Sequence, residues 1–343
     1  KYYDSYKLSK IVYLDENKNI NQEVEIRINE QFYKELYNFE DWQEIDNETY
    51  QNYKLMADID FYGKDNKKTN INISRFDGNG YKLKNINLVL DQNMSGIINT
   101  VKTEIKNVIF ENIYIENLSA KNNVGIIVSN TGIVENLNFK DVTINAPNTD
   151  YVAIITKNEN DKISNINLEN IYITGKNYTA SFIAYSYSTN IQTIIANNIN
   201  ITGKGPYIGG IFAYIANKGN AEATDITLSN SNISAVNSTY VGGIVAYIPY
   251  STTNIMWISD VTLENNYVYG DSNVGGLGAR LPYARNITAK GNTVSGKYYV
   301  GGLTAAIYDL YDAVFEEGNV ENSSDYTGGI TASSWNSATI YNV

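Results

Sequence analysis

Histidine and cysteine, which carry much of protein chemistry, are absent from all 343 residues of this chain. Zinc sites built on His or Cys, Ser-His-Asp triads, cysteine nucleophiles and disulfides are therefore excluded within it. What remains for an enzyme is a pair of carboxylates, a lysine or tyrosine base, or a calcium site. We predict no cofactor.

Two groups of acidic residues come closest to a hydrolase site. A glycosidase needs two carboxyl groups about 5 to 9.5 Å apart across the scissile bond. Asp58 and Asp60 alternate along a predicted strand, so both point to the same side of it. The second group lies near the C-terminal end and comprises Asp309, Asp312, Glu316 and Glu317. Neither group falls at a mid-chain cleft, so a solvated acidic surface or a weak calcium site competes with catalysis.

Tyrosine is the other residue type that could carry function, because the chain contains 30 of them. A tyrosine offers a rigid apolar face with a hydroxyl, which suits contact with a glycan or a protein surface. Many tyrosines take equivalent positions in a repeat. Tyr151, Tyr207, Tyr240, Tyr299 and Tyr326 precede the repeated element, and Tyr185, Tyr214 and Tyr247 close it.

Stacked in register, these tyrosines form either a docking strip or a structural stack that needs no partner. Both interpretations stay open from the sequence. Two further tyrosines stand beside Pro249 and Pro282 in expected loops, where a partner could reach them. The candidate partner-binding residues are Tyr185, Tyr214, Tyr247, Tyr250 and Tyr283.

The repeated element is clearest at 240–247, which reads Tyr-Val-Gly-Gly-Ile-Val-Ala-Tyr. Weaker copies recur about every 26 to 33 residues, a period typical of solenoids and repeat arrays. The copies open at Met94, Val124, Val152, Ala180, Ile208, Val241, Val274, Val300 and Thr327. The paired glycines lack the following helix and the Lys-Ser/Thr of a phosphate loop, so they indicate sharp corners or close backbone approach.

Each period contains three short strands and no segment long enough for a crossover helix. A second repeated column is expected to form a corner ladder of amide hydrogen bonds. Its members are Asn112, Asp141, Asn170, Asn198, Asn230 and Asn265. Coiling the chain so that like strands stack predicts an all-β fold, a right-handed parallel β-helix (solenoid) of about nine coils.

The repeats favour a single elongated domain over 28–343, preceded by a lead-in or linker at 1–27. Residues 28–75 are expected to form an N-terminal cap and the first coil, and residues 76–343 the repeats. In the cap, Asn29 is placed to start a short helix whose Phe32, Tyr33 and Leu36 share one face. Such a helix would cover the exposed end of the core.

The net charge of −11 disfavours a nucleic-acid partner, since such proteins gather Lys and Arg on one face. No apolar run approaches the roughly 18 residues of a membrane span, so membrane insertion is not expected. Lys1 in place of a start Met suggests a piece of a longer protein. We expect a monomeric module of a larger chain that is secreted or held at the cell surface.

The chain resembles the GLUG-repeat β-helices of bacterial secreted surface proteins. The resemblance is carried by the entry strand 53–61, by 76–86 with its Asn79-Gly80 turn, and by the successive Val-Gly-Gly-Ile/Leu copies. This group includes the non-catalytic region of immunoglobulin-A-protease-type zinc metallopeptidases. The resemblance implies an ancillary module that spaces, scaffolds or docks a large substrate. Any histidine-containing peptidase domain would lie outside this sequence.

Three functions are therefore open. The leading hypothesis is a non-catalytic module of a large secreted or cell-surface bacterial protein, a zinc metalloprotease, that engages a host protein or glycan. The second is a β-helix polysaccharide hydrolase or lyase that works with carboxylates. The third is an adhesin or structural stalk.

Overall fold

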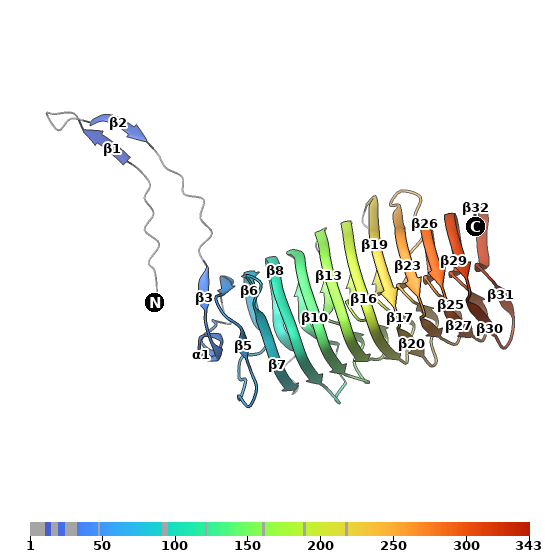
Figure 1. Cartoon of the computed structure of the whole chain (residues 1–343), viewed down its shortest axis with the longest axis horizontal. Helices are drawn as coiled ribbons and strands as arrows, with labels where there is room; N and C mark the ends of the chain where they lie inside the picture. The colour runs from blue at the N-terminus through green and yellow to red at the C-terminus, as the bar shows by residue number, and fades with distance from the viewer. Residues whose placement is uncertain are drawn as a thin grey trace.

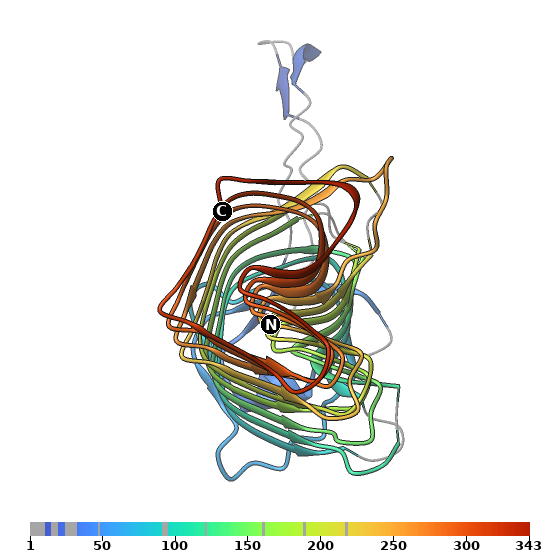
Figure 2. The same ribbon diagram turned by 90° about the vertical axis from the view of Figure 1, so that its right-hand side faces the viewer.

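The computed structural model describes residues 11–14, 20–24, 33–46, 49–90, 95–120, 122–159, 162–187, 190–216 and 219–343. Parallel strands of successive coils pair side by side and build a β-solenoid of about ten coils (Figure 1). Seen along the solenoid axis, the coils follow one another in a common, indented outline (Figure 2). The predicted parallel β-helix is thus confirmed, with about one coil more than expected.

Each coil contains a long strand that pairs in register with the coils before and after. Leu137, for example, pairs with Val108 of the preceding coil and with Ile166 of the following one. The long strands, some of them divided in two, are β8 (Gly96–Glu116), β10 (Ile133–Asn145), β13 (Lys162–Thr174), β16 (Asn190–Gly203), β19 (Ala221–Ser229) with β20 (Asn232–Ala235), β23 (Met256–Glu264) with β24 (Tyr267–Tyr269), β26 (Gly278–Lys290) with β27 (Thr293–Gly296), β29 (Thr304–Glu316) with β30 (Asn319–Asn322), and β32 (Thr331–Tyr341).

The rest of each coil consists of short strands that flank the glycine motif. Before or within the motif lie β11 (Tyr151–Val152), β14 (Tyr178–Thr179), β17 (Tyr207–Gly209), β21 (Tyr240–Gly242), β25 (Asn273–Gly275), β28 (Tyr299–Gly301) and β31 (Tyr326–Gly328). After it come β12 (Ile155–Asn158), β15 (Ile183–Ser186), β18 (Phe212–Ile215) and β22 (Val245–Tyr247), while β9 (Asn123–Asn130) spans both positions. The coil at 133–158, for example, contains three strands, β10, β11 and β12, as predicted.

The N-terminal part contains the remaining elements. The entry strands are β3 (Lys34–Leu36), β4 (Gln51–Leu55), β5 (Ile59–Asp60), β6 (Ile71–Asp77) and β7 (Lys82–Val89). Ahead of them, β1 (Ile11–Leu14) and β2 (Ile20–Val24) pair as an antiparallel hairpin, with Ile11 opposite Val24. The hairpin lies within the segment predicted as a lead-in.

The capping helix is present but begins later than predicted. The expected helix at 28–36 is wrong for its described part, because Leu36 lies in β3 and pairs with Leu55 of the next coil. Asn29 and Phe32 lie outside the described residues. The helix is α1 (Phe39–Gln43), where the Asn38 side chain accepts a hydrogen bond from the N–H of Asp41 at 2.9 Å. Its Trp42 is fully buried, and its ring meets those of Phe61 and Phe76 edge to face.

Asparagine ladders run along two corners of the solenoid. In the predicted ladder the amide of Asn170 donates to Asp141 at 2.7 Å, and that of Asn198 donates to Asn170 at 2.8 Å. These residues adopt left-handed backbone conformations, with φ near +55°. Asn and Asp tolerate that region better than other non-glycine residues, so the corner itself selects them. A second ladder follows the other bend of the long strands, where Asn136 donates to Asn107 and Asn165 donates to Asn136.

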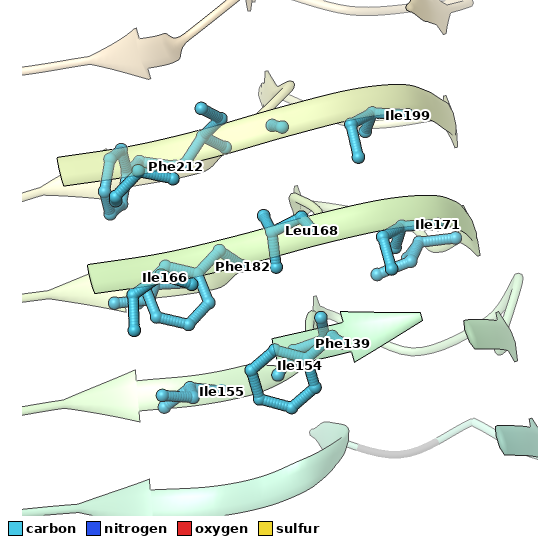
Figure 3. Packing of buried hydrophobic residues seen from close by; sticks show 14 of the residues in the cluster. Phe139, Ile154, Ile155, Ile166, Leu168, Ile171, Phe182, Ile199 and Phe212 are labelled. Carbon is cyan, nitrogen blue, oxygen red and sulfur yellow. The ribbon is translucent and has the colours of Figure 1, made fainter. Parts of the chain in front are cut away.

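The core is a continuous stack of apolar side chains inside the coils. Phe110, Phe139, Phe182 and Phe212 are fully buried, and consecutive rings lie 5.1, 6.4 and 6.3 Å apart. Figure 3 shows Phe139, Phe182 and Phe212 at successive levels among isoleucines that also point inward. Each coil therefore packs mainly on its two neighbours, as in other solenoids.

The glycine pairs let neighbouring coils approach closely. A Cβ atom on Gly210 would lie 1.9 Å from the carbonyl oxygen of Gly243, and one on Gly243 would lie 1.9 Å from that of Gly276. Neither residue has a positive φ, so the requirement is for space and not for an unusual backbone conformation. The interpretation of these glycines as architecture is confirmed.

Candidate functional site

Four tyrosines stack face to face on consecutive coils, just ahead of the glycine motif. Parallel pairing puts Tyr151, Tyr178, Tyr207 and Tyr240 at one register position. Their ring centroids lie 4.5, 4.8 and 5.6 Å apart, with planes within 23° of parallel. The column arises because the strand repeat brings identical side chains above one another at about 4.8 Å.

A second column follows the glycine motif and contains three of the predicted candidates. Tyr185, Tyr214 and Tyr247 stack at 4.9 and 5.3 Å, and the guanidinium of Arg280 lies 5.2 Å from the Tyr247 ring. At the other end of the same register column, Lys157 pairs with Tyr185. The second column is thus flanked by a cation at each end.

The two columns meet edge to face. The rings of Tyr207 and Tyr214 lie 5.4 Å apart, and those of Tyr240 and Tyr247 lie 4.8 Å apart. Tyr207 and Tyr214 come from consecutive strands, β17 and β18, on either side of a glycine pair. Outward side chains of consecutive strands touch only where the chain bends inward between them, and the coils in Figure 2 share such an indentation.

We call these seven residues the tyrosine array: Tyr151, Tyr178, Tyr185, Tyr207, Tyr214, Tyr240 and Tyr247. All seven are partly exposed. The candidates Tyr185, Tyr214 and Tyr247 therefore lie together, in contact with the tyrosines that precede the motif. Tyr299 and Tyr326 stack at 4.8 Å further along, beyond Asn273, which takes the register position next to Tyr240.

Tyr178 belongs to the array although the sequence alignment misses it. The alignment sets Ala180 opposite Val152, whereas the backbone pairs Thr179 with Val152 and with Ile208. This coil has no glycine pair to anchor the alignment. Tyr178 could have been found from its position directly before Thr179, because Tyr151 and Tyr207 directly precede the two residues that pair with Thr179.

Burial within the array favours the neutral form of several of its hydroxyls. Burial raises the pKa of Tyr178 to about 12, and the neighbouring Tyr151 and Tyr207 add to the rise. Burial also raises the pKa values of Tyr185 and Tyr214. In the unfolded chain these hydroxyls would ionise near the ordinary tyrosine value of about 10.

We therefore expect alkaline pH to destabilise the solenoid through the array. Because the folded pKa of Tyr178 is raised, its contribution is complete below about pH 10 and is lost as the pH rises towards 12. The urea midpoint should fall over this interval, and it should fall less steeply in Tyr178→Phe. Denaturation curves of both proteins between about pH 9 and 12 measure this. Equal slopes would show that Tyr178 titrates normally.

The other two candidates form a separate aromatic cluster on the β23–β26–β29 face. Tyr250 lies 4.9 Å from Tyr308 and 6.3 Å from Tyr283, and the Tyr283 ring lies 5.3 Å from Trp257. The expected loop position of Tyr283 is wrong, because it lies within β26 and is only 6% exposed. Its partners Tyr308 and Trp257 come from β29 and β23, on either side, and cover it. Tyr283 is thus mainly a packing residue, whereas Tyr250 stays partly exposed.

The carboxylate candidates near the N-terminus are held in structural contacts. Lys84 Nζ lies 3.6 Å from Asp58 and 3.9 Å from Asp60. A hydrogen bond from the Asn85 amide keeps the pKa of Asp60 below its ordinary value. A general acid needs the opposite shift, so Asp60 is unsuited to protonate a leaving group.

The carboxylates near the C-terminus serve similar contacts. Asp309 accepts the backbone N–H of Thr339 at 3.0 Å, and Asp312 accepts the Asn342 amide at 2.6 Å in the second asparagine ladder. Glu317 pairs with Lys290 at 3.1 Å, and Glu316 is exposed. Within the described residues, no group of three or more acidic side chains could hold a metal ion. No helix in the described part of the chain is long and apolar enough to cross a membrane.

Comparisons with known proteins show no family for this chain. No family model matches the sequence, and no curated protein matches it. Among solved structures, the chain is similar to a protein from Bacteroides ovatus that is provisionally named an immunoglobulin A1 protease. The two are 15% identical over 91% of this chain and 83% of that chain, with a TM-score of 0.39. A likeness at this level carries no argument about fold or function.

Proposed function

We propose that this chain is a non-catalytic β-solenoid module of a larger secreted or cell-surface bacterial protein, and that its tyrosine array docks a host protein. The observation that carries the proposal is the array itself. Seven partly exposed tyrosines from consecutive coils contact one another, with ring centroids 4.5 to 6.4 Å apart. Rigid aromatic residues of this kind dominate the binding energy of many protein interfaces.

The packing of the array favours a protein over a glycan as its partner. Sugars bind tyrosines by stacking on a free ring face. Both faces of Tyr178 and of Tyr214 are covered by neighbouring rings, at 4.8 and 4.5 Å for Tyr178 and at 4.9 and 5.3 Å for Tyr214. What the array can offer is ring edges and hydroxyls, which suit polar and apolar groups of a protein surface.

Charge at the ends of the second column adds specificity. Lys157, Tyr185, Tyr214, Tyr247 and Arg280 follow one another in register over five coils. Lys157 is paired with Glu159, and Arg280 stacks on Tyr247. A partner with an apolar centre and an acidic group beyond it would complement this arrangement, and such charges mainly steer association.

A second, more specific proposal concerns the larger protein to which this module belongs. We infer a zinc metallopeptidase whose catalytic domain lies elsewhere, supported by the resemblance of the entry segment and the glycine repeats to GLUG-repeat β-helices. Immunoglobulin A is then the first host protein to test. A histidine-containing peptidase motif in the flanking sequence of the full-length protein would support this parent, and a wall anchor alone would favour a stalk or adhesin.

The docking proposal is tested by binding of the 343-residue chain to immobilised human immunoglobulin A1. We expect Tyr240→Ala to weaken binding at least tenfold, because Tyr240 contacts both Tyr207 and Tyr247 at one end of the array. The matched control is Tyr326→Ala, which removes a 56% exposed tyrosine of the same register column outside the array. Absence of binding at about 10 µM, or equal loss in both variants, would overturn docking of this partner by the array.

A further inference from the structure

A hollow of about 450 Å³ lies on the outer surface near the N-terminal end, away from the tyrosine array in sequence. One wall is the 61–66 loop between β5 and β6, and the floor is formed by outward residues of β7 and β8. The side chains that line it include Tyr62, Lys64, Asn66, Asn87, Asn112 and Tyr114. Ligand sites of small molecules commonly have a volume of this order.

Two tyrosines that line the hollow are more exposed than any tyrosine of the array. Tyr62 is 81% exposed and Tyr114 is 37% exposed. An aromatic side chain so exposed on a loop contributes little to the core, and it leaves a ring face free for stacking. Tyr114 is held in place by a hydrogen bond from its hydroxyl to Glu116 at 3.2 Å.

Amide groups with unused hydrogen-bonding capacity lie beside the tyrosines. The corner ladder fixes Asn112, whose Nδ2 donates to Asn85 at 2.7 Å. Its Oδ1 receives no donor from the described residues, and the amide of Asn87 makes no hydrogen bond within that part of the chain. Both are in reach of solvent at the floor of the hollow. Together they offer acceptors and a donor to a hydroxylated ligand.

Asn66 adds a buried donor in the wall. Its Oδ1 accepts from Gln43 Nε2 at 2.9 Å and from the N–H of Lys68 at 3.2 Å, and these two donors fix the amide orientation. The Asn66 Nδ2 is buried and has no acceptor among the described residues. A buried donor without an acceptor lowers the stability of the folded state, and a ligand oxygen that accepts its hydrogen bond would remove this penalty. The Asn66 Nδ2 atom is covered, so a contact between it and a ligand requires the 61–66 loop to shift.

From these observations we propose that the hollow is a binding site for a neutral hexose or N-acetylhexosamine unit of a glycan. Free aromatic surface suits the apolar face of a pyranose, and the amides suit its hydroxyl and acetamido groups. Charge should contribute little to ligand binding in the hollow, because Lys64 lies 3.4 Å from Glu40 and its charge is partly neutralised. The proposal does not depend on docking of a protein by the tyrosine array.

Saturation-transfer NMR of the 343-residue chain with N-acetyllactosamine and with maltose tests the site. We expect transfer to at least one of the two sugars at about 10 mM, with a Kd near the millimolar range. Tyr62→Ala should weaken binding about tenfold, because it removes the most exposed aromatic face of the hollow. Asn66→Asp should weaken it several-fold, because the carboxylate keeps the acceptor for Gln43 and Lys68 but removes the free donor.

Two control variants test whether sugar binding is confined to the hollow. Tyr267→Ala removes a 41% exposed tyrosine from the same outward register column as Tyr114, far from the hollow, and should leave binding unchanged. Tyr240→Ala, in the tyrosine array, should also leave sugar binding unchanged. Absence of transfer to both sugars, or binding that survives Tyr62→Ala, overturns the proposal. Tighter binding of a sialylated sugar than of its neutral parent would contradict the neutral ligand class.

Discussion

Replacement of Gly243 with alanine should lower the free energy of unfolding by about 3 kcal/mol or more, beyond the usual cost of overpacking. The added Cβ would lie 1.9 Å from the carbonyl oxygen of Gly276 and 3.1 Å from its carbonyl carbon. Both contacts are with backbone of the next coil, which cannot move aside as a side chain can. Urea denaturation followed by circular dichroism measures the loss.

Gly329 provides a matched control at the same repeat position. A Cβ atom on Gly329 would meet nothing within 4 Å, because it lies in the last coil. Gly329→Ala should be neutral or should stabilise by about 0.4–1 kcal/mol, since alanine lowers the entropy of the unfolded chain. If Gly243→Ala were equally harmless, close coil approach would not explain the glycine pairs, and a ligand-binding role for their backbone would need new consideration.

Replacement of Phe139 with alanine should cost about 3–5 kcal/mol, the usual range for a buried aromatic residue. Phe139 is fully buried and packs between Phe110 and Phe182, one coil to each side. The cavity would therefore interrupt the phenylalanine stack in the middle of the solenoid (Figure 3). The denaturant midpoint of the variant, compared with wild type, gives the cost.

The control for Phe139 is an apolar residue of a long strand that points outward. Ile195 lies in β16 and is 51% exposed. Ile195→Ala should change the unfolding free energy by about 0.5 kcal/mol or less. A comparable loss at both positions would mean that burial in the coil interior is not the main source of stability.

The coiled fold could be predicted because several kinds of residue repeat along the chain with the same period. The glycine pairs, the inward apolar residues and the corner asparagines all recur together, and each is required by the same geometry. Asn112, Asp141 and Asn170 were identified by spacing, and their φ values of 55° to 57° explain why Asn and Asp stand there. The Asn79-Gly80 turn also follows from residue type, since both adopt positive φ.

Other features depended on contacts that the sequence does not display. The amphipathic pattern at 28–36 suggested a helix, but pairing of Leu36 with Leu55 draws its end into the first coil as a strand. Tyr178 was missed because its coil lacks the glycines that fix the register. The sugar-sized hollow could not be foreseen, since its wall and floor come from segments far apart in the sequence, around Tyr62 and Tyr114.

The stacking of the tyrosines was predicted in part. The structure shows stacking of Tyr185, Tyr214 and Tyr247. The binding experiment above tests whether they contact a partner. Tyr283 was misplaced because the proline beside it suggested a loop, whereas Pro282 lies inside β26. The acidic candidates were judged by spacing alone, and the structure shows Asp58, Asp60, Asp309 and Asp312 in contacts that support the fold.

A single co-incubation of the chain with immunoglobulin A1, repeated with a panel of polysaccharides, decides whether the chain is a non-catalytic docking module. Binding and intact mass are read from the same samples. We predict that immunoglobulin A1 is bound and recovered intact, with no shortened polysaccharide. Cleavage of either substrate by the purified chain, abolished by Asp58→Asn or Asp309→Asn, would contradict this prediction and establish a carboxylate enzyme in its place.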